Sequence, residues 1–288
     1  MALIVGVHGI AQEQLGRRQL LGTWENALLD GVEAALRGGS ARTLSFDLAY
    51  YGRLFLDAMD EGGQTTKSAD VLDDTERWTR ESGWEDLRAE AEEAAGQEAL
   101  DAVAPLEDKG YTRLPPGVAL ILRALDWRYG PGAAVLFIGA FRQVRRYLRD
   151  PDLKAAIDAA VDAAVAADCR VLVGHSLGSV VAFEYVRRNP ARELDLILTM
   201  GSPLGARFVR SLLPEPEFGA GGLPAVATWV NIRDPRDPVA FAGDLARSGW
   251  NAQDVTVHNG GDSHAAPRYL GKRQTGAALL AALSEPAE

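Results

Sequence analysis

The chain has 288 residues, of which 47% are hydrophobic, enough for the core of one large domain or of a domain with an insertion. Its formal net charge of −10 argues against nucleic-acid binding, because contact with phosphates requires a basic surface. No apolar run approaches the roughly 20 residues that cross a bilayer, and the first residues lack the basic flank and apolar length of a signal peptide. We therefore expect a cytoplasmic protein without a transmembrane anchor.

The first 52 residues alternate between strand and helix patterns. A strand is predicted at residues 3–7, and it runs directly into a glycine-containing turn at His8-Gly9. A helix is predicted from Thr23, as its N-cap, to about Arg37, where two glycines stop it. The next strand is predicted at residues 43–49.

Residues 53–150 interrupt this alternation, and we interpret them as a mostly helical cap inserted into a core of residues 1–52 and 151–288. Charge is divided unevenly within the cap. Residues 57–108 carry 17 acidic and 4 basic side chains, whereas residues 109–149 carry 8 basic and 1 acidic side chain. The two halves are electrostatically opposite.

Two interpretations of the basic half stay open, and both concern a helix predicted after Gly130. One face of this helix is apolar and is formed by Phe137, Phe141, Val144 and Leu148, and another is basic and is formed by Arg142, Arg145, Arg146 and Arg149. The favoured interpretation is that the basic face offsets an acidic helical layer at about residues 84–103 within one folded cap. The alternative is peripheral contact of this helix with an anionic membrane surface.

The regular alternation returns after residue 150. Helices are predicted at residues 152–167, from about residue 180 to Asn189, and at 273–283, and strands at 169–173, 194–200, 227–232 and 254–258. With the two early strands, these runs predict a mainly parallel six-stranded sheet with helices on both faces, which is an α/β fold. Ligands of such sheets bind beyond the carboxyl ends of the strands.

One pentapeptide, Gly-His-Ser-Leu-Gly at residues 174–178, lies between a predicted strand and a predicted helix. This arrangement is typical of a nucleophile elbow, in which a sharp turn holds a serine hydroxyl clear of the backbone. Gly174 and Gly178 are the small residues that such a turn requires on either side of Ser176. Ser176 is therefore the candidate nucleophile.

A serine nucleophile needs a base, and the sequence has only four histidines. His264 lies in the loop after the last predicted strand, where a base would reach Ser176. His175 adjoins the serine and must point elsewhere, His8 is expected to brace its own turn, and His258 belongs to a strand pattern. We therefore predict His264 as the base.

The carboxylate that orients this base is expected in the loop after the strand at residues 227–232. Asp237 lies deeper in that loop than Asp234 and is followed by Pro238 and Val239, which redirect the chain. Asp234 precedes a proline and is better suited to forming the turn. Asp237 is therefore the favoured acid.

Acyl transfer also needs backbone N–H groups aimed at the developing oxyanion. Leu177 follows the nucleophile and opens a helix, and Ile10 lies in the turn after His8 and Gly9. These two residues are the predicted donors. Cys169 is the only cysteine and the histidines do not cluster, so we expect no disulfide, metal site or cofactor.

The ordered motifs resemble those of the α/β-hydrolases, especially lipase and esterase branches that include the inositol-deacylase-like proteins. They are His-Gly-Ile at residues 8–10, the elbow, Gly-Ser-Pro-Leu-Gly at 201–205, Asp-Pro-Val at 237–239 and Ser-His at 263–264. The resemblance covers residues 1–52 and 151–288. It implies the α/β-hydrolase fold, with Ser176 as nucleophile, His264 as base, Asp237 as acid, and Ile10 and Leu177 as oxyanion donors.

The expected function is hydrolysis of a carboxylic ester of a small acyl substrate through an acyl-serine intermediate. A thioesterase or an acyltransferase would use the same three residues, and sequence does not separate these reactions. A non-catalytic protein that keeps the pocket and a peptide hydrolase are further alternatives.

Overall fold

The computed structural model describes residues 3–9, 15–36, 44–55, 83–106, 111 and 114–284. Its centre is a sheet of strands β1 (Ile4–Val7), β2 (Phe46–Ala49), β3 (Val171–His175), β4 (Leu194–Met200), β5 (Val226–Arg233) and β6 (Gln253–Thr256). All neighbours pair in parallel, in the order β2-β1-β3-β4-β5-β6. The predicted α/β class and the parallel sheet of six strands are confirmed.

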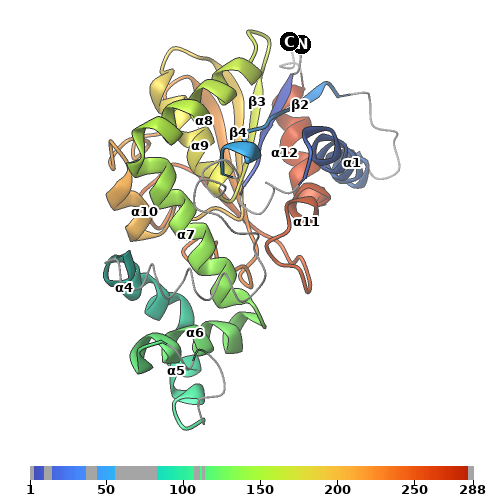
Figure 1. Ribbon diagram of the computed structural model, residues 1–288. Coiled ribbons are helices and arrows are strands. Elements are labelled where there is room, and N and C mark those ends of the chain that lie inside the picture. Colours follow the sequence, from blue (N-terminus) through green and yellow to red (C-terminus); the bar gives the residue numbers. More distant parts are fainter. Residues whose placement is uncertain are drawn as a thin grey trace.

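Helices cover both faces of this sheet (Figure 1). One face carries α1 (Arg17–Leu36), α11 (Ala266–Leu270) and α12 (Arg273–Leu283), and the other carries α8 (Pro151–Ala164) and α9 (Leu177–Arg188). Beside α8 and α9 lie α7 (Ala133–Arg149) and α10 (Arg207–Leu212). The helices α4 (Gly83–Ala95), α5 (Gln97–Val103) and α6 (Pro116–Tyr129) form the end of the molecule opposite the two termini.

The strands are buried on both sides, which explains their nearly continuous apolar sequences. Successive side chains alternate between the faces of the sheet: Ile4 packs with the α1 and α12 side, and Val5 packs with the α8 and α9 side. The hydrophobic cluster that contains Val5 continues without a break into the side chains of α4 to α7. One hydrophobic core therefore joins the sheet to the helices of the predicted cap.

One helix prediction needs correction. The first helix begins at Arg17, and Thr23 lies within it, where its hydroxyl donates to the carbonyl of Gln19 at 2.9 Å and caps nothing. The acidic helical layer predicted at about residues 84–103 is formed by two helices, which are divided at Gly96, where the φ of 75° ends α4. Thr43, the predicted start of the second strand, lies outside the described residues, and β2 begins at Phe46.

The apolar face of α7 points into the protein. Phe137, Phe141 and Val144 are fully buried and Leu148 is 8% exposed. The ring of Phe141 lies 4.6 Å from that of Phe137 and 6.3 Å from that of Phe241, which follows β5. On the basic side, Arg145 pairs with Asp86 of α4 at 3.7 Å. The apolar face of α7 is thus covered by protein.

We expect the quadruple variant with glutamine at Arg142, Arg145, Arg146 and Arg149 to have a lower Tm and unchanged, absent binding to anionic vesicles. The arginines would lose contacts such as the Arg145–Asp86 pair, while the apolar face would stay buried. Thermal melts and co-sedimentation with anionic vesicles at low and high salt check this prediction, because salt weakens attraction to a charged surface. Salt-sensitive vesicle binding by the unchanged protein would instead support the membrane interpretation.

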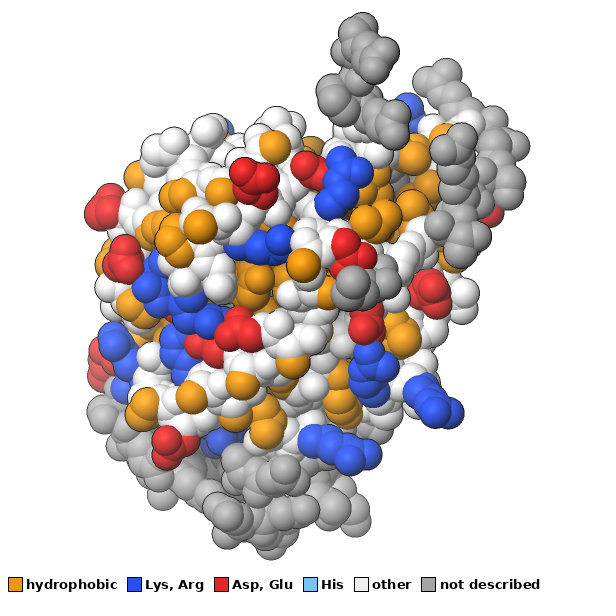
Figure 2. Space-filling view, turned by 90° about the horizontal axis from the view of Figure 1, so that it is seen from above, with side chains coloured by type: hydrophobic (Ala, Val, Ile, Leu, Met, Phe, Trp, Pro, Cys, Tyr) orange, Lys and Arg blue, Asp and Glu red, His pale blue; other side chains and the backbone are white. Residues whose placement is uncertain are grey.

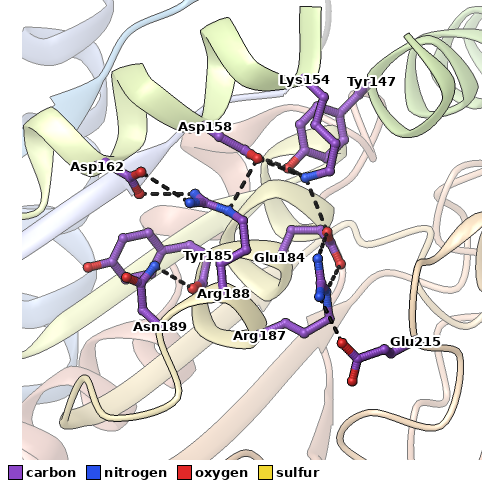
Figure 3. A network of polar contacts seen from close by, with 10 residues as sticks. All are labelled: Tyr147, Lys154, Asp158, Asp162, Glu184, Tyr185, Arg187, Arg188, Asn189 and Glu215. Atoms are coloured by element: carbon purple, nitrogen blue, oxygen red, sulfur yellow. Dashed lines mark hydrogen bonds and ion pairs between the residues drawn. The ribbon is translucent and has the colours of Figure 1, made fainter. Parts of the chain in front are cut away.

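A network of charged side chains joins α7, α8 and α9 (Figure 3). Lys154 of α8 binds Asp158 at 2.9 Å and the fully buried Glu184 of α9 at 3.1 Å. The Tyr147 hydroxyl of α7 donates to Asp158 at 2.7 Å, and Arg187 binds Glu184 at 2.9 Å. A buried carboxylate such as Glu184 is tolerated only with partners of this kind, so the network fixes α9 against its neighbours.

The surface carries charges of both signs close together. On the face seen in Figure 2, basic side chains lie among acidic ones, and hydrophobic side chains are scattered between them. Within the described ranges, every helix is too short or too polar to cross a membrane.

Candidate active site

The topological switch point of the sheet, where the strand order reverses, lies between β1 and β3. The chain passes from β1 to β2 on one side of β1 and then returns to β3 on the other side. Crevices beyond the carboxyl ends of two such strands are the usual ligand sites of open α/β sheets. His8 and Gly9 follow β1, and Ser176 follows β3, so both predicted motifs meet at this point.

Ser176 forms the sharp turn that the pentapeptide predicts. Its φ of 55° and ψ of −127° lie in a region that non-glycine residues rarely adopt, and the residue joins β3 directly to α9. A Cβ at Gly178 would come within 2.0 Å of the Val7 carbonyl oxygen, and one at Gly174 within 2.6 Å of the Ser179 Cα. The two glycines are therefore required by close backbone approach.

Ser176, His264 and Asp237 form one hydrogen-bonded chain. Nε2 of His264 lies 3.0 Å from Oγ of Ser176. Nδ1 of His264 lies 2.9 Å and 2.8 Å from the two carboxylate oxygens of Asp237. Because a carboxylate only accepts, Nδ1 carries the ring hydrogen and Nε2 is free to accept from the serine. All three side chains are buried, with His264 at 8% exposure.

Asp237 is held ionised by its neighbours. Burial favours the neutral carboxyl, but the His264 ring and the hydrogen bonds to Asp237 outweigh it and hold its pKa below the usual value. These bonds include one from the Tyr269 hydroxyl at 2.8 Å and one from the Val239 N–H at 2.9 Å. An ionised Asp237 orients the His264 ring and would stabilise its protonated form.

Asp234, the less favoured acid candidate, lies in a different environment. Its carboxylate accepts hydrogen bonds from the N–H of Arg236, at 2.8 Å, and from the N–H of Asn259. The first bond closes the turn expected ahead of Pro235. Asp234 therefore ties the loop after β5 to the loop after β6, which carries His264.

His175 supports the backbone of His264. Its Nε2 lies 2.7 Å from the His264 carbonyl oxygen, and the two rings lie 4.7 Å apart. Burial and the nearby His264 ring lower the pKa of His175 to about 3, so the ring is neutral and donates to that carbonyl. The expected burial of His175 is found, but its contact with the other histidine was not foreseen.

His8 holds the turn after β1. Its Nε2 accepts from the Tyr51 N–H at 3.1 Å, its Nδ1 lies 2.9 Å from the Gly9 carbonyl oxygen, and the ring stacks on Tyr51 at 4.1 Å. Burial lowers the pKa of His8 to about 4. The neutral ring thus joins the end of β1 to the chain that follows β2.

Because His8 and His175 are buried and neutral, we expect the free energy of unfolding to fall in acid. Below pH 6.5 the unfolded chain takes up protons at both residues, whereas the folded protein resists them until about pH 4 for His8 and 3 for His175. Unfolding is therefore favoured progressively from pH 6.5 downward, by as much as about 1.4 kcal/mol per pH unit for each histidine.

Urea denaturation at pH 7.5 and pH 5 measures this effect. The free energy of unfolding should decrease from pH 7.5 to pH 5 in both proteins. We expect this decrease to be about 2 kcal/mol smaller in His175→Asn than in the unchanged protein. His258→Gln is the matched control, because His258 is exposed. An identical loss in all three proteins would contradict the prediction.

Of the two predicted oxyanion donors, Leu177 lies within the described residues. The Leu177 N–H belongs to the first turn of α9, where backbone donors have no partner within the helix. Ile10, the second predicted donor, lies outside the described residues. Its neighbour Gly9 lies so close to Ser176 that a Cβ at Gly9 would come within 2.5 Å of the Ser176 Cβ. The turn after β1 therefore packs directly against the strand-to-helix turn at Ser176.

Two supporting residues escaped sequence analysis. Tyr269 also accepts the Asp234 N–H at 3.0 Å, so it links both aspartates of the loop after β5. It lies on α11, whose five residues are too few to show helical periodicity. Ser179 donates from Oγ to the Ser176 carbonyl at 2.6 Å, and its position on α9 gave no sign of this role.

A serine, a histidine and an aspartate in this arrangement are suited to nucleophilic attack on an acyl carbon, with the histidine as base. Within the described ranges, no three His, Cys, Asp or Glu side chains gather as a metal site would require. No protein-family model, curated protein or solved structure gives a match to this chain. The chemistry of the site is therefore inferred from its own geometry.

Proposed function

We propose that the protein is a serine hydrolase with an α/β-hydrolase fold that cleaves a carboxylic ester. The observation that carries this proposal is the contact of 3.0 Å between Ser176 Oγ and His264 Nε2, in a ring whose Nδ1 is bound to Asp237. The strand-to-helix turn at Ser176 and the chain order Ser, Asp, His also support it, since both characterise this fold.

In the first half of the reaction, Oγ of Ser176 attacks the ester carbonyl carbon while its proton passes to Nε2 of His264. Asp237 stabilises the imidazolium that forms. The carbonyl oxygen becomes an oxyanion, to which the Leu177 N–H donates, and we propose the Ile10 N–H as second donor. The bond to the alkoxy oxygen then breaks, and the alcohol leaves with the proton from Nε2.

In the second half, water replaces the alcohol. His264 takes a proton from water, and the resulting hydroxide attacks the acyl carbon. The bond between that carbon and Oγ breaks, Ser176 regains the proton, and the carboxylic acid leaves. We propose that the acyl chain lies under the cap helices, whose inward faces are apolar.

Reaction with a fluorophosphonate tests the nucleophile. Only an activated serine attacks such phosphorus readily, so the labelled peptide should contain Ser176 and not Ser202, whose Oγ bonds to Ser179 and to the Leu204 N–H. Label on a peptide without Ser176 would refute the assignment. Rates with esters and thioesters of increasing acyl length would then separate an esterase from a thioesterase.

A further inference from the structure

A pocket of about 500 Å³ lies between the predicted cap and the chain that follows β5. Its walls come from α4 of the cap, from α10, and from the chain after β5, including Phe241 and Ala242. Contacts between α4 and α10 place these walls side by side (Figure 1). The volume is in the range of small-molecule sites. Phe241 and Ala242 come shortly after Val239 in the sequence, and the N–H of Val239 binds the Asp237 carboxylate.

The lining of this pocket carries one more basic than acidic side chain. Four guanidinium groups line it, from Arg207, Arg210, Arg233 and Arg247, against three carboxylates, from Glu90, Glu93 and Asp244. The side chains of Arg207 and Arg247 are 73% and 87% exposed, so they form the rim. Arg233 is 21% exposed and lies deeper. A local excess of positive charge thus occurs in a chain of net charge −10.

The deep arginine is incompletely paired. Its Nη2 lies 3.4 Å from Asp244, beyond the usual range of a strong hydrogen bond, and Arg247 shares the same carboxylate at 3.5 Å. Nε of Arg233 is buried and has no hydrogen-bond partner among the residues that the structure describes. A guanidinium binds two oxygens of one carboxylate or phosphate through adjacent N–H groups.

Arg210 offers a second donor group in the same pocket. Its guanidinium lies over the Trp250 ring, 5.3 Å from the centroid, and donates to the Ser248 carbonyl, so its orientation is fixed. No carboxylate of the described residues forms an ion pair with Arg210.

We propose that this arginine pocket binds an anionic oxygen group, a phosphate or a carboxylate, with Arg233 and Arg210 as its inner ligands. The anion would bind the guanidinium of Arg233, whose Nη2 makes only a long contact with Asp244, and would compete with that carboxylate. The bound group is either part of the substrate or a free anion, and both sources require the same contacts.

Titration with inorganic phosphate, followed by calorimetry and by the rise in Tm, tests the pocket without reference to catalysis. We expect Arg233→Gln and Arg210→Gln each to weaken phosphate binding about tenfold, because each removes a charged hydrogen-bond donor. Arg273→Gln is the charge-matched control: Arg273 is exposed, begins α12 and does not line the pocket.

Asp244→Asn should act in the opposite direction. It removes the carboxylate that competes for Arg233, so phosphate should bind more tightly, whereas a purely structural pocket would gain nothing. The proposal is overturned if phosphate does not bind the unchanged protein. It also fails if Arg273→Gln weakens binding as much as Arg233→Gln, or if Asp244→Asn does not tighten it.

A second arm distinguishes the two sources of the anion, and this arm alone rests on the proposed esterase function. For a substrate group, Arg233→Gln should lower kcat/KM about tenfold for the anionic mono-p-nitrophenyl succinate and leave neutral p-nitrophenyl butyrate unchanged. For a free anion, the variant should treat both esters alike. If neither ester is hydrolysed, the proposed function fails while the phosphate titration still decides the pocket.

Discussion

Replacing Ser176 by alanine is expected to lower kcat for a p-nitrophenyl ester by a factor of about 10⁶, because the proposed reaction loses the atom that bonds to the acyl carbon. The hydroxyl lies 3.0 Å from the base and belongs to a strained turn that directs it to one place. The hydroxyl of the nearby Ser179 lies instead within hydrogen-bond distance of the Ser176 carbonyl oxygen and of Ser202 Oγ. Steady-state rates and pre-steady-state bursts of p-nitrophenol measure the loss.

The matched control is Ser211→Ala, since Ser211 is an exposed serine of α10 whose hydroxyl bonds to the Phe208 carbonyl. It should leave kcat unchanged. His264→Ala should be nearly as damaging as Ser176→Ala, and the double variant should be little worse than either single one, because the two residues act as a unit. A Ser176→Ala protein that keeps most of its activity would exclude the acyl-serine route.

Sequence predicts this fold well where one signal governs one element. The strand at residues 194–200 and the helix at 273–283 have the predicted bounds, because apolar runs and helical periodicity there meet clear stops. Elsewhere tertiary contacts extend an element. Helix α1 continues six residues ahead of Thr23, since Leu20 is buried on the same face as Trp24.

The candidate site divides in the same way. The elbow and the loop positions of His264 and Asp237 follow from local sequence and from the rule that strands of a parallel sheet end at one edge. The contacts of Tyr269 and His175 depend on how loops separated by many residues pack together. The sequence of α7 shows an apolar face and a basic face. It does not show whether protein or membrane covers the apolar face, because that depends on tertiary packing.

The largest effect after loss of the serine or the base is expected for Asp237→Asn, which should lower kcat by about 10⁴-fold. Asparagine keeps the shape of the side chain, but its amide can donate to Nδ1 and so favour the ring form whose hydrogen is on Nε2. That form cannot accept the proton of Ser176. The Tyr269 hydroxyl would keep an acceptor only if the amide oxygen faces it.

Asp234→Asn is the matched comparison, because it makes the same substitution at a buried aspartate of the same loop. Asp234 bonds to the N–H groups of Arg236 and Asn259 and does not touch His264. We therefore expect a lower Tm, with a decrease in kcat of no more than about tenfold, from slight displacement of the loop that carries the base. Measuring kcat and Tm for both variants decides between the aspartates. A larger loss of kcat in Asp234→Asn than in Asp237→Asn would transfer the role of acid to Asp234.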